Sequence, residues 1–313
     1  MTRSARNPRQ PRRSRRALFG VVLLVVLAIG VLGLGAVATN AFGAGDKFDR
    51  LVAKVERFFI GAPPADRSTR PTVEVTPRPS ASPSPTPTPA SLPPGATPTP
   101  SPTPIPRVAA DFALPIDAKS VFAHELRKDW CAPAGVQMTL AALGLADNSE
   151  GFQHELVARI HEWETYADSH NYEWGPAAMA SALDAYGAPG YELRAYTSRG
   201  DAIRDAAIAI NTTGTPAILL AWRGAHTWVM TGYRADADPT VFPDAVMTGA
   251  YIFDPWYPWN SSIWGQSDPP GTFQDEAEMR RNFLPWKRPE GKYPDRDGKF
   301  IILVPTVAVS ASR

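Results

Sequence analysis

The chain has 313 residues, of which 44% are hydrophobic and 20% charged, a composition typical of a folded protein with room for about two average domains. Its net charge of +1 conceals two regions of opposite charge, since residues 1–106 hold 14 Lys and Arg against five Asp and Glu, whereas residues 107–313 hold 18 against 26. All nine Trp and all five His lie in the acidic C-terminal region, which makes nucleic-acid binding a poor interpretation of it.

The N-terminus has the pattern of a membrane anchor. Residues 1–16 contain seven Arg and no acidic residue, and the 22 residues from Ala17 to Ala38 carry no charge. About 20 apolar residues span a bilayer as a helix, and flanking basic residues stay on the cytoplasmic side. We therefore expect a basic cytoplasmic segment (1–16) and a single transmembrane helix (17–42) in the cell membrane, with the C-terminal domain extracellular. The alternative is a signal sequence cleaved after the small residues AVA, which would make the protein secreted.

Two further segments separate this anchor from the C-terminal domain. Within residues 46–60, apolar side chains recur at helical spacing with Lys and Arg between them, which predicts an amphipathic juxtamembrane helix on the outer membrane face. A short self-association helix is the other interpretation. Residues 62–106 contain 16 Pro in 45 residues, so we expect a disordered, Pro/Ser/Thr-rich stalk that holds the domain away from the surface.

Residues 107–313 have the pattern of one globular α+β domain. Apolar residues at helical spacing and end signals such as Gly predict helices over 131–144, 152–167, 175–187 and 201–214. Short β-branched and aromatic runs bounded by Gly, Pro or Asp predict strands over 216–222, 227–233, 250–256 and 299–305. Helices first and strands afterwards indicate a helical part packed on a largely antiparallel sheet.

The chain keeps a single cysteine, Cys131, at the start of the helix CAPAGVQMTLAALG, with Pro133 in its first turn. A cysteine most often packs as a small buried hydrophobe. In an exported protein, however, cysteines are usually paired, and this one has no partner. The positive end of a helix dipole lowers the pKa of a thiol, and the free backbone N–H groups there can hold an oxyanion. We therefore predict a nucleophilic Cys131 that is a thiolate near neutral pH.

A nucleophilic thiol needs an imidazole as base, and the imidazole needs an acceptor that orients it. His226 stands in RGAHTWVMTGY at the start of an apolar strand, and Asp254 ends the strand YIFDP, so neighbouring strands can bring the two together. His154 and His161 are seven residues apart on one helix, but zinc needs a third ligand and an open position. We expect these two to lie on a solvated helix face, and we predict neither a metal nor a cofactor.

Three motifs in this order, WCAPAGVQMTLAAL, TPAILLAWRGAHTWVMTGY and YIFDPW, resemble the peptidase C39-like family within the papain-like cysteine peptidase superfamily. The resemblance implies a papain-like fold, in which the helical part carries Cys131 and the sheet carries His226 and Asp254, and it implies a catalytic role for all three. The family's oxyanion Gln is absent, and Glu125 in HELRKDWC stands near its position. An ionised Glu cannot donate a hydrogen bond, whereas a Glu kept neutral by burial can.

The segment DPWYPWNSSIWG, directly after the strand YIFDP, is rich in aromatic residues, which often line binding pockets. Trp130, Trp256 and Trp259 are the candidates for a substrate groove, and ordinary packing of an irregular loop explains them equally well. The sequence thus predicts an exported, membrane-tethered cysteine peptidase that acts on a peptide or protein substrate. The alternatives are a non-catalytic papain-like binding module at the cell surface and a transglutaminase-like acyl transferase, which uses the same Cys-His-Asp chemistry.

Overall fold

The computed structural model describes residues 70–76, 105–169, 174–287 and 291–309. Three predicted segments lie outside the described residues. They are the basic segment (1–16), the transmembrane helix or signal sequence (17–42) and the amphipathic helix (46–60). In the part of the chain that the structure describes, no helix is long and apolar enough to cross a membrane. All described residues belong to one compact unit, Pro63–Arg313.

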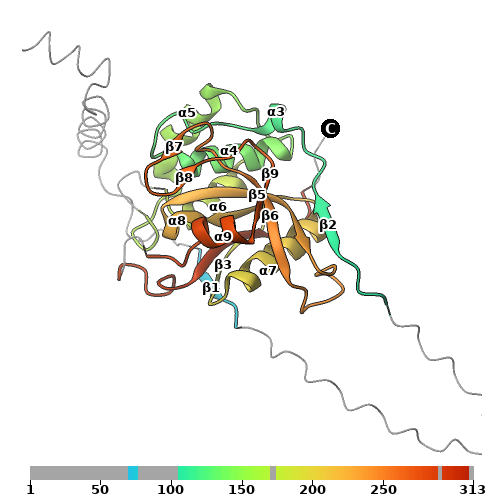
Figure 1. The fold of residues 1–313 in the computed structure, drawn as a ribbon. Coiled ribbons are helices and arrows are strands. Elements are labelled where there is room, and N and C mark those ends of the chain that lie inside the picture. Colours follow the sequence, from blue (N-terminus) through green and yellow to red (C-terminus); the bar gives the residue numbers. More distant parts are fainter. Residues whose placement is uncertain (1–69, 77–104, 170–173, 288–290, 310–313) are drawn as a thin grey trace, which may run out of the picture. The chain divides into compact units, whose positions relative to one another are not determined.

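The centre of this unit is an eight-stranded sheet in which all pairings but one are antiparallel (Figure 1). Its main path runs β1-β3-β10-β4-β5-β6-β9, and β2 pairs separately with β5. Two short strands, β7 and β8, form a second sheet. The strands are β1 (Thr72–Glu74), β2 (Ala110–Ala113), β3 (Tyr191–Tyr196), β4 (Ala217–Leu220), β5 (His226–Ala235), β6 (Met247–Phe253), β7 (Asn260–Ser261), β8 (Gly265–Gln266), β9 (Thr272–Asp275) and β10 (Phe300–Pro305).

Helices lie on both faces of this sheet (Figure 1). They are α3 (Ala118–Val121), α4 (Cys131–Ala142), α5 (Glu150–Ala158), the 3₁₀ turn η2 (Ile160–Glu162), α6 (Pro176–Ala185), α7 (Arg199–Thr213), the short turn α8 (Ala221–Gly224) and α9 (Glu276–Asn282). Helices α4, α5 and α6 share one hydrophobic cluster with the sheet, whereas α7 and α9 share another. The domain is therefore a three-layer α+β structure with a mostly antiparallel sheet.

The sequence of β10 shows why both layers form. All six residues of FIILVP are buried. Because successive side chains of a strand point to opposite faces, Ile301 and Leu303 join the cluster around α4 and α6, while Ile302 and Val304 join the cluster around α7. A strand buried on both faces reads as a continuous apolar run, which is the pattern that predicted this strand.

Within residues 107–313, the expected order of helices followed by strands is not kept. β2 precedes the helices, β3 lies between α6 and α7, and α8 and α9 lie between later strands. β3 has the sequence YELRAY, whose buried and exposed positions alternate, but its charged Glu192 and Arg194 interrupt the apolar run that marks the other strands. In the sheet, Arg194 forms ion pairs with Glu192 and Asp205.

The predicted disordered stalk, residues 62–106, is wrong for the segment that forms β1. The short run TVEV is rich in β-branched residues, and it adds to the exposed edge of β3 as a parallel strand. Arg70 also forms an ion pair with Asp184 at 2.8 Å, and Glu74 pairs with Lys299 at 2.9 Å. Proline content averaged over 45 residues concealed this short strand. The residues 77–104 that follow it lie outside the described residues.

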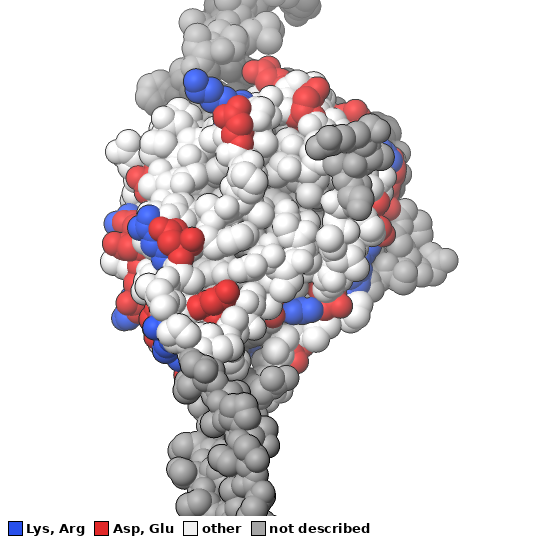
Figure 2. Space-filling model, turned by 90° about the vertical axis from the view of Figure 1, so that its right-hand side faces the viewer, with Lys and Arg blue, Asp and Glu red and all other residues white. Residues whose placement is uncertain are grey.

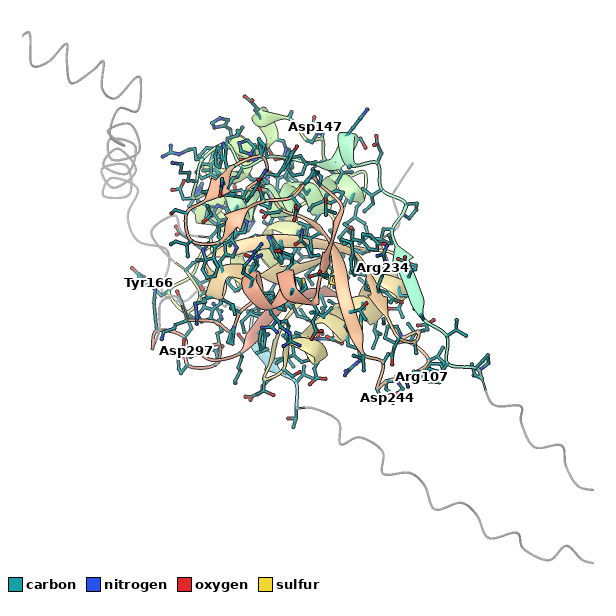
Figure 3. All side chains as sticks on the ribbon, in the orientation of Figure 1. Arg107, Asp147, Tyr166, Arg234, Asp244 and Asp297 are labelled. Carbon is teal, nitrogen blue, oxygen red and sulfur yellow. The ribbon has the colours of Figure 1, made fainter. Side chains whose placement is uncertain are left out.

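Where the described chain resumes, an ion-pair cluster fixes it to the sheet. Arg107 donates hydrogen bonds to both Asp236 and Asp244. Figure 3 labels Arg107 and Asp244, which lie next to each other. A few residues on, Asp111 of β2 accepts a hydrogen bond from Arg234 of β5 at 2.9 Å. Figure 2 shows that acidic and basic side chains of this side of the molecule lie together along its margins, around a broad uncharged area.

Candidate active site

Helix α4 places Cys131 directly over the start of β5. The helix begins at Cys131 and is buried from Ala132 to Leu140, so it runs through the core. Gly135 allows this close approach, because a Cβ atom there would lie 2.4 Å from the Cγ2 atom of Thr227. The Sγ atom of Cys131 consequently lies 4.0 Å from the carbonyl oxygen of Ala225, beside His226.

The pairing of β5 with β6 brings His226 and Asp254 together. The antiparallel register opposes Val229 to Phe253, so the start of β5 and the end of β6 lie side by side at the same end of the sheet. There the Nε2 atom of His226 lies 2.7 Å from Oδ1 of Asp254, and both side chains are buried. The backbone N–H of Trp256 donates to the same Oδ1 atom at 2.9 Å. This arrangement leaves Nδ1 as the ring nitrogen of His226 that is free for other chemistry.

Glu125 joins the cysteine and the histidine in one cluster. A carboxylate oxygen of Glu125, the Sγ of Cys131 and a ring nitrogen of His226 all lie within 4.8 Å of one another. The structure therefore brings together the four residues that the sequence predicted as nucleophile, base, orienting acceptor and oxyanion residue, although they lie up to 129 positions apart in the chain.

The environment of Glu125 disfavours its charged form. Its side chain is fully buried, neither carboxylate oxygen has a hydrogen-bond partner, and only its backbone N–H is anchored, to the carbonyl of Pro255. Burial is the main cause that raises the pKa of Glu125 to about 9. The negative charges of Asp254 and Asp129 contribute the remainder of this rise. At neutral pH the carboxyl group is therefore protonated, and a protonated carboxyl group can donate one hydrogen bond.

The prediction of a thiolate at Cys131 is wrong for this state of the protein. Cys131 keeps part of its surface exposed, but desolvation raises the pKa of its thiol, and the neighbouring Glu125 adds to the rise. Hydrogen bonding with Thr227 opposes this shift without cancelling it. Desolvation thus outweighs the helix N-terminus, because the dipole effect amounts to only about 0.3–1 kcal/mol in exposed settings.

The three predicted groove tryptophans have different surroundings. Trp256 packs edge-on against His226, with ring centroids 6.3 Å apart. Trp259 packs edge-on against Trp256 at 5.1 Å. Trp130, although it precedes Cys131, packs against His154 at 5.0 Å. The first two therefore form an aromatic wall beside the cluster, and the ring of Trp130 is engaged with helix α5.

Sequence reasoning missed Trp222, whose ring lies closer to the imidazole of His226 than the ring of Trp256 does. Its ring stacks on the imidazole of His226 with a centroid separation of 3.8 Å and an interplanar angle of 17°. Its other side faces Trp264, at 5.7 Å and 7°, and its Nε1–H donates to Asn282. The only signal for it in the sequence is a tryptophan four residues before His226, in a segment that was assigned to the end of a strand.

The backbone at Trp222 is unusual. Trp222 and Arg223 both have left-handed φ angles, 51° and 64°, a conformation that non-glycine residues rarely adopt. Gly224 follows with φ 86°, and a Cβ atom there would lie 2.3 Å from the ring of Trp286. Strained backbone of this kind persists only where its surroundings hold it in place, and it often marks functional sites. Here the hydrogen bond from Lys287 N–H to the Arg223 carbonyl helps to hold the turn.

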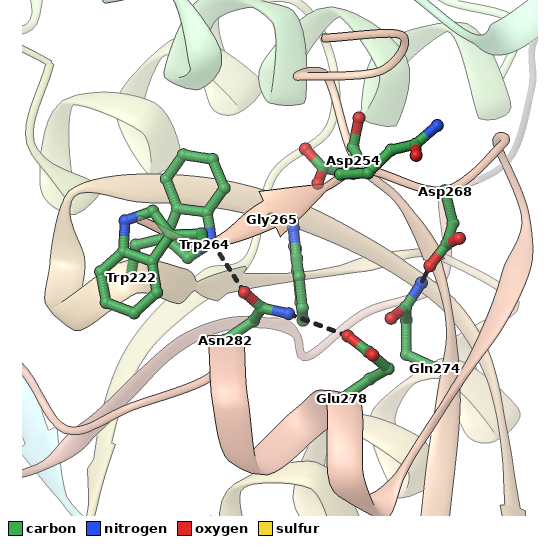
Figure 4. Close-up of a pocket in the computed structure, with 11 residues that line it drawn as sticks. Trp222, Asp254, Trp264, Gly265, Asp268, Gln274, Glu278 and Asn282 are labelled. Atoms are coloured by element: carbon green, nitrogen blue, oxygen red, sulfur yellow. Dashed lines mark hydrogen bonds between the residues drawn. The ribbon is translucent and has the colours of Figure 1, made fainter. Parts of the chain in front are cut away.

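A small polar cleft lies next to Trp222, which lines it together with Trp264 (Figure 4). It contains about 260 Å³ of empty volume, including space open to solvent, and Asp254 lies at its border. Hydrogen bonds from Gln274 to Asp268 and from Asn282 to Glu278 support its walls. Trp222 and Asp254, which both contact the predicted base, thus also line this cleft.

His154 and His161 are both exposed, but they do not share one helix as expected, since His154 lies in α5 and His161 in the 3₁₀ turn η2. His154 packs against Trp130, and Nδ1 of His161 lies 3.0 Å from the carbonyl oxygen of Ala158. Among the residues that the structure describes, the group whose atoms are spaced to hold a metal ion is instead Glu125, Cys131 and His226.

No family model, no curated protein and no solved structure matches this chain.

Proposed function

We propose that this protein is an exported, membrane-tethered cysteine peptidase of papain-like fold, in which Cys131 attacks the carbonyl carbon of a peptide bond. The observation that carries the proposal is the His226 imidazole, which is bound through Nε2 to Asp254 and leaves Nδ1 for the thiol of Cys131. A nucleophile, a base and an orienting carboxylate in this order are the arrangement that activates thiols and hydroxyls for acyl transfer. Its substrate is a peptide or protein.

The reaction begins from a neutral thiol, because the pKa of Cys131 is raised. Nδ1 of His226 accepts the thiol proton as sulfur bonds to the carbonyl carbon. The imidazolium then donates this proton to the leaving amine as the C–N bond breaks, which leaves a thioester on Cys131. A water molecule, deprotonated by His226, cleaves the thioester and restores the thiol.

Two groups support the charges that form in these steps. The face of Trp222 against His226 favours the imidazolium, since a cation is attracted to the negative face of an aromatic ring. The developing oxyanion receives one hydrogen bond from the backbone N–H of Cys131, which has no partner within the helix, and a second from the protonated carboxyl group of Glu125.

The tether is proposed from the sequence of residues 1–106. The seven arginines and the uncharged run after them favour an uncleaved anchor with the domain outside the cell, and secretion after signal cleavage is the alternative. Protease treatment of intact cells is expected to release a fragment that begins in the Pro-rich segment. A domain that stays protected inside intact cells would refute both topologies.

A non-catalytic binding module is the second candidate, and a specific observation favours it. A thiol with a raised pKa beside a carboxyl group is a poor resting nucleophile. A papain-like domain that no longer turns over substrate would have little need to lower the pKa of its cysteine. Such a module would bind peptides along the same aromatic wall without cleaving them.

Peptide-library cleavage by the full-length protein, read by mass spectrometry in chelator-containing buffer, separates these two candidates. The peptidase is expected to cleave, and Cys131→Ala is expected to abolish cleavage. Products carrying an added amine instead of a new carboxylate would indicate acyl transfer. Binding of library peptides without any cleavage, unchanged in Cys131→Ala, would establish the binding module.

Glu125→Gln tests the oxyanion role. Glu125 can donate only while it is protonated, so the rate for the native protein falls as pH rises through about 9. Gln is a permanent donor, and at one unit above this pKa the variant is expected to exceed the native protein by about tenfold, relative to their ratio at pH 7. Parallel pH profiles for the two proteins would show that Glu125 does not hold the oxyanion.

A further inference from the structure

The cluster of Glu125, Cys131 and His226 combines three kinds of metal ligand in one place. Its sulfur, nitrogen and oxygen atoms lie within 4.8 Å of one another. Around a tetrahedral Zn²⁺ with bond lengths of about 2.0–2.3 Å, neighbouring ligand atoms are ~3.5 Å apart. Movements of about 1 Å would therefore bring all three atoms to bonding distance around one ion.

The surroundings of His226 suit a metal ligand as well as a base. A ligating histidine almost always donates its second ring N–H to a carboxylate or a carbonyl oxygen, which fixes the ring and leaves the other nitrogen for the metal. His226 has this arrangement, because Nε2 is bound to Asp254 at 2.7 Å, which leaves Nδ1 as the ring nitrogen available to a metal. Asp254 is itself held by the backbone N–H of Trp256.

Glu125 provides the second, independent observation. Its two carboxylate oxygens are fully buried and have no hydrogen-bond partner. A buried polar group without a partner carries a desolvation penalty, and a ligand that it can bind removes that penalty. A hard anionic oxygen next to a soft thiolate and an imidazole matches zinc and cobalt(II), and does not match calcium or magnesium, which prefer oxygen ligands alone.

We infer that Glu125, Cys131 and His226 form a binding site for Zn²⁺ or a similar thiophilic divalent cation, with the fourth coordination position open. On binding, Sγ and the carboxylate each form a bond to the ion, and any proton that they carried passes to solvent. The ion then occupies the lone pairs of sulfur and Nδ1 that peptide cleavage requires. Metal binding and nucleophilic reactivity of Cys131 are therefore mutually exclusive.

The site is tested with Co²⁺, because its absorption spectrum reports thiolate ligation directly and does not depend on hydrolysis. Co²⁺ is titrated into metal-free full-length protein, and Zn²⁺ is then added as competitor. We expect a thiolate-to-cobalt charge-transfer band and the visible bands of a four-coordinate ion, both removed by stoichiometric Zn²⁺. Cys131→Ser is expected to lose the charge-transfer band. Zn²⁺ is also expected to protect Cys131 from alkylation.

Matched variants identify the other ligands. Mutation of an outer hydrogen-bond partner typically lowers metal affinity by about 10–100-fold, and this effect is expected for Asp254→Asn, which keeps the hydrogen bond to His226 but removes its charge. Loss of a direct ligand in Glu125→Gln is expected to weaken Zn²⁺ binding by at least ~100-fold. Glu150→Gln makes the same change at an exposed position in α5 and is expected to leave the affinity unchanged. Thermal unfolding with and without Zn²⁺ checks that each variant is folded.

The outcomes are distinct for the metal site and for the proposed peptidase. A Co²⁺ spectrum without a thiolate band, or equal Zn²⁺ affinities for Glu125→Gln and Glu150→Gln, would overturn the metal site. A thiolate band that Glu125→Gln weakens supports it, whether or not peptide cleavage is found. Cleavage that depends on Cys131 but is insensitive to Zn²⁺ supports the peptidase and contradicts the metal site.

Discussion

Replacement of Asp254 by Asn isolates the contribution of one negative charge to the proposed reaction. Oδ1 of Asp254 accepts two hydrogen bonds, from Nε2 of His226 at 2.7 Å and from the backbone N–H of Trp256 at 2.9 Å. In the variant, the amide oxygen should take the place of Oδ1, because an NH₂ group there would face two donors. The histidine tautomer is thus preserved, and only the charge is lost.

The size of the effect follows from the same geometry. In the transition state an imidazolium forms next to the carboxylate, with charge centres about 4 Å apart in a buried setting, as the 2.7 Å contact implies. At an effective dielectric constant of about 20, such a pair is stabilised by about 4 kcal/mol. Since each 1.36 kcal/mol corresponds to a factor of ten in rate, we expect Asp254→Asn to lower kcat/KM by ~10³.

The assay is kcat/KM for a cleaved library peptide, with the His226 tautomer observed by ¹⁵N NMR. Asp147→Asn, at an exposed position, is the matched control, and we expect its kcat/KM to equal that of the native protein. A loss of less than tenfold in Asp254→Asn would refute the role of Asp254 in stabilising the imidazolium. A loss of ~10⁴ or more, with the tautomer reversed, would show that the Trp256 N–H does not determine which way the amide points.

Three further predictions concern stability and the thiol. Arg296→Met leaves Asp168 buried without its ion-pair partner, which lies at 2.7 Å, so we expect the free energy of unfolding to fall by about 3–5 kcal/mol. This loss is measured as a lower Tm, and adding Asp168→Leu should recover part of it. An unchanged Tm would contradict the prediction. Gly224→Ala forces a residue with a Cβ atom to adopt φ 86° and places that atom 2.3 Å from the ring of Trp286. Chemical denaturation should therefore show a free energy of unfolding lowered by more than about 1 kcal/mol. An unchanged free energy would mean that the turn can relax. Because burial raises the pKa of Cys131, iodoacetamide in chelator should label the folded protein at pH 8 more slowly than the protein unfolded in urea, as measured by mass spectrometry; faster labelling of the folded protein would show a thiolate.

Much of the central fold was predictable because its strands are apolar runs. The segments that became β4, β5, β6 and β10 are rich in β-branched and aromatic residues and end at Gly, Pro or Asp, so local composition identified them. β1 and β3 escaped prediction for a different reason. The first is three residues long within a proline-rich region, and the second carries charges that are satisfied only by partners distant in sequence.

The predicted cluster depended on order and spacing along the chain. Cys131 at a helix start, His226 at a strand start and Asp254 at a strand end are each recognisable from neighbouring residues. Trp222 was not recognisable in this way. Its stacking on His226 requires a left-handed turn that is held by Asn282 and Lys287, both of which come much later in the chain.

By itself, the sequence determined the division of the chain into a basic, apolar and proline-rich N-terminal region and an acidic, aromatic domain, and it determined the identity and order of the side chains in the proposed active site. Composition and periodicity are local properties, and they are sufficient for this. Only the tertiary structure decided the protonation states of Cys131 and Glu125, because desolvation depends on everything packed around a group. The helix N-terminus favours a thiolate at Cys131, but the burial that the fold imposes on both groups is the larger effect.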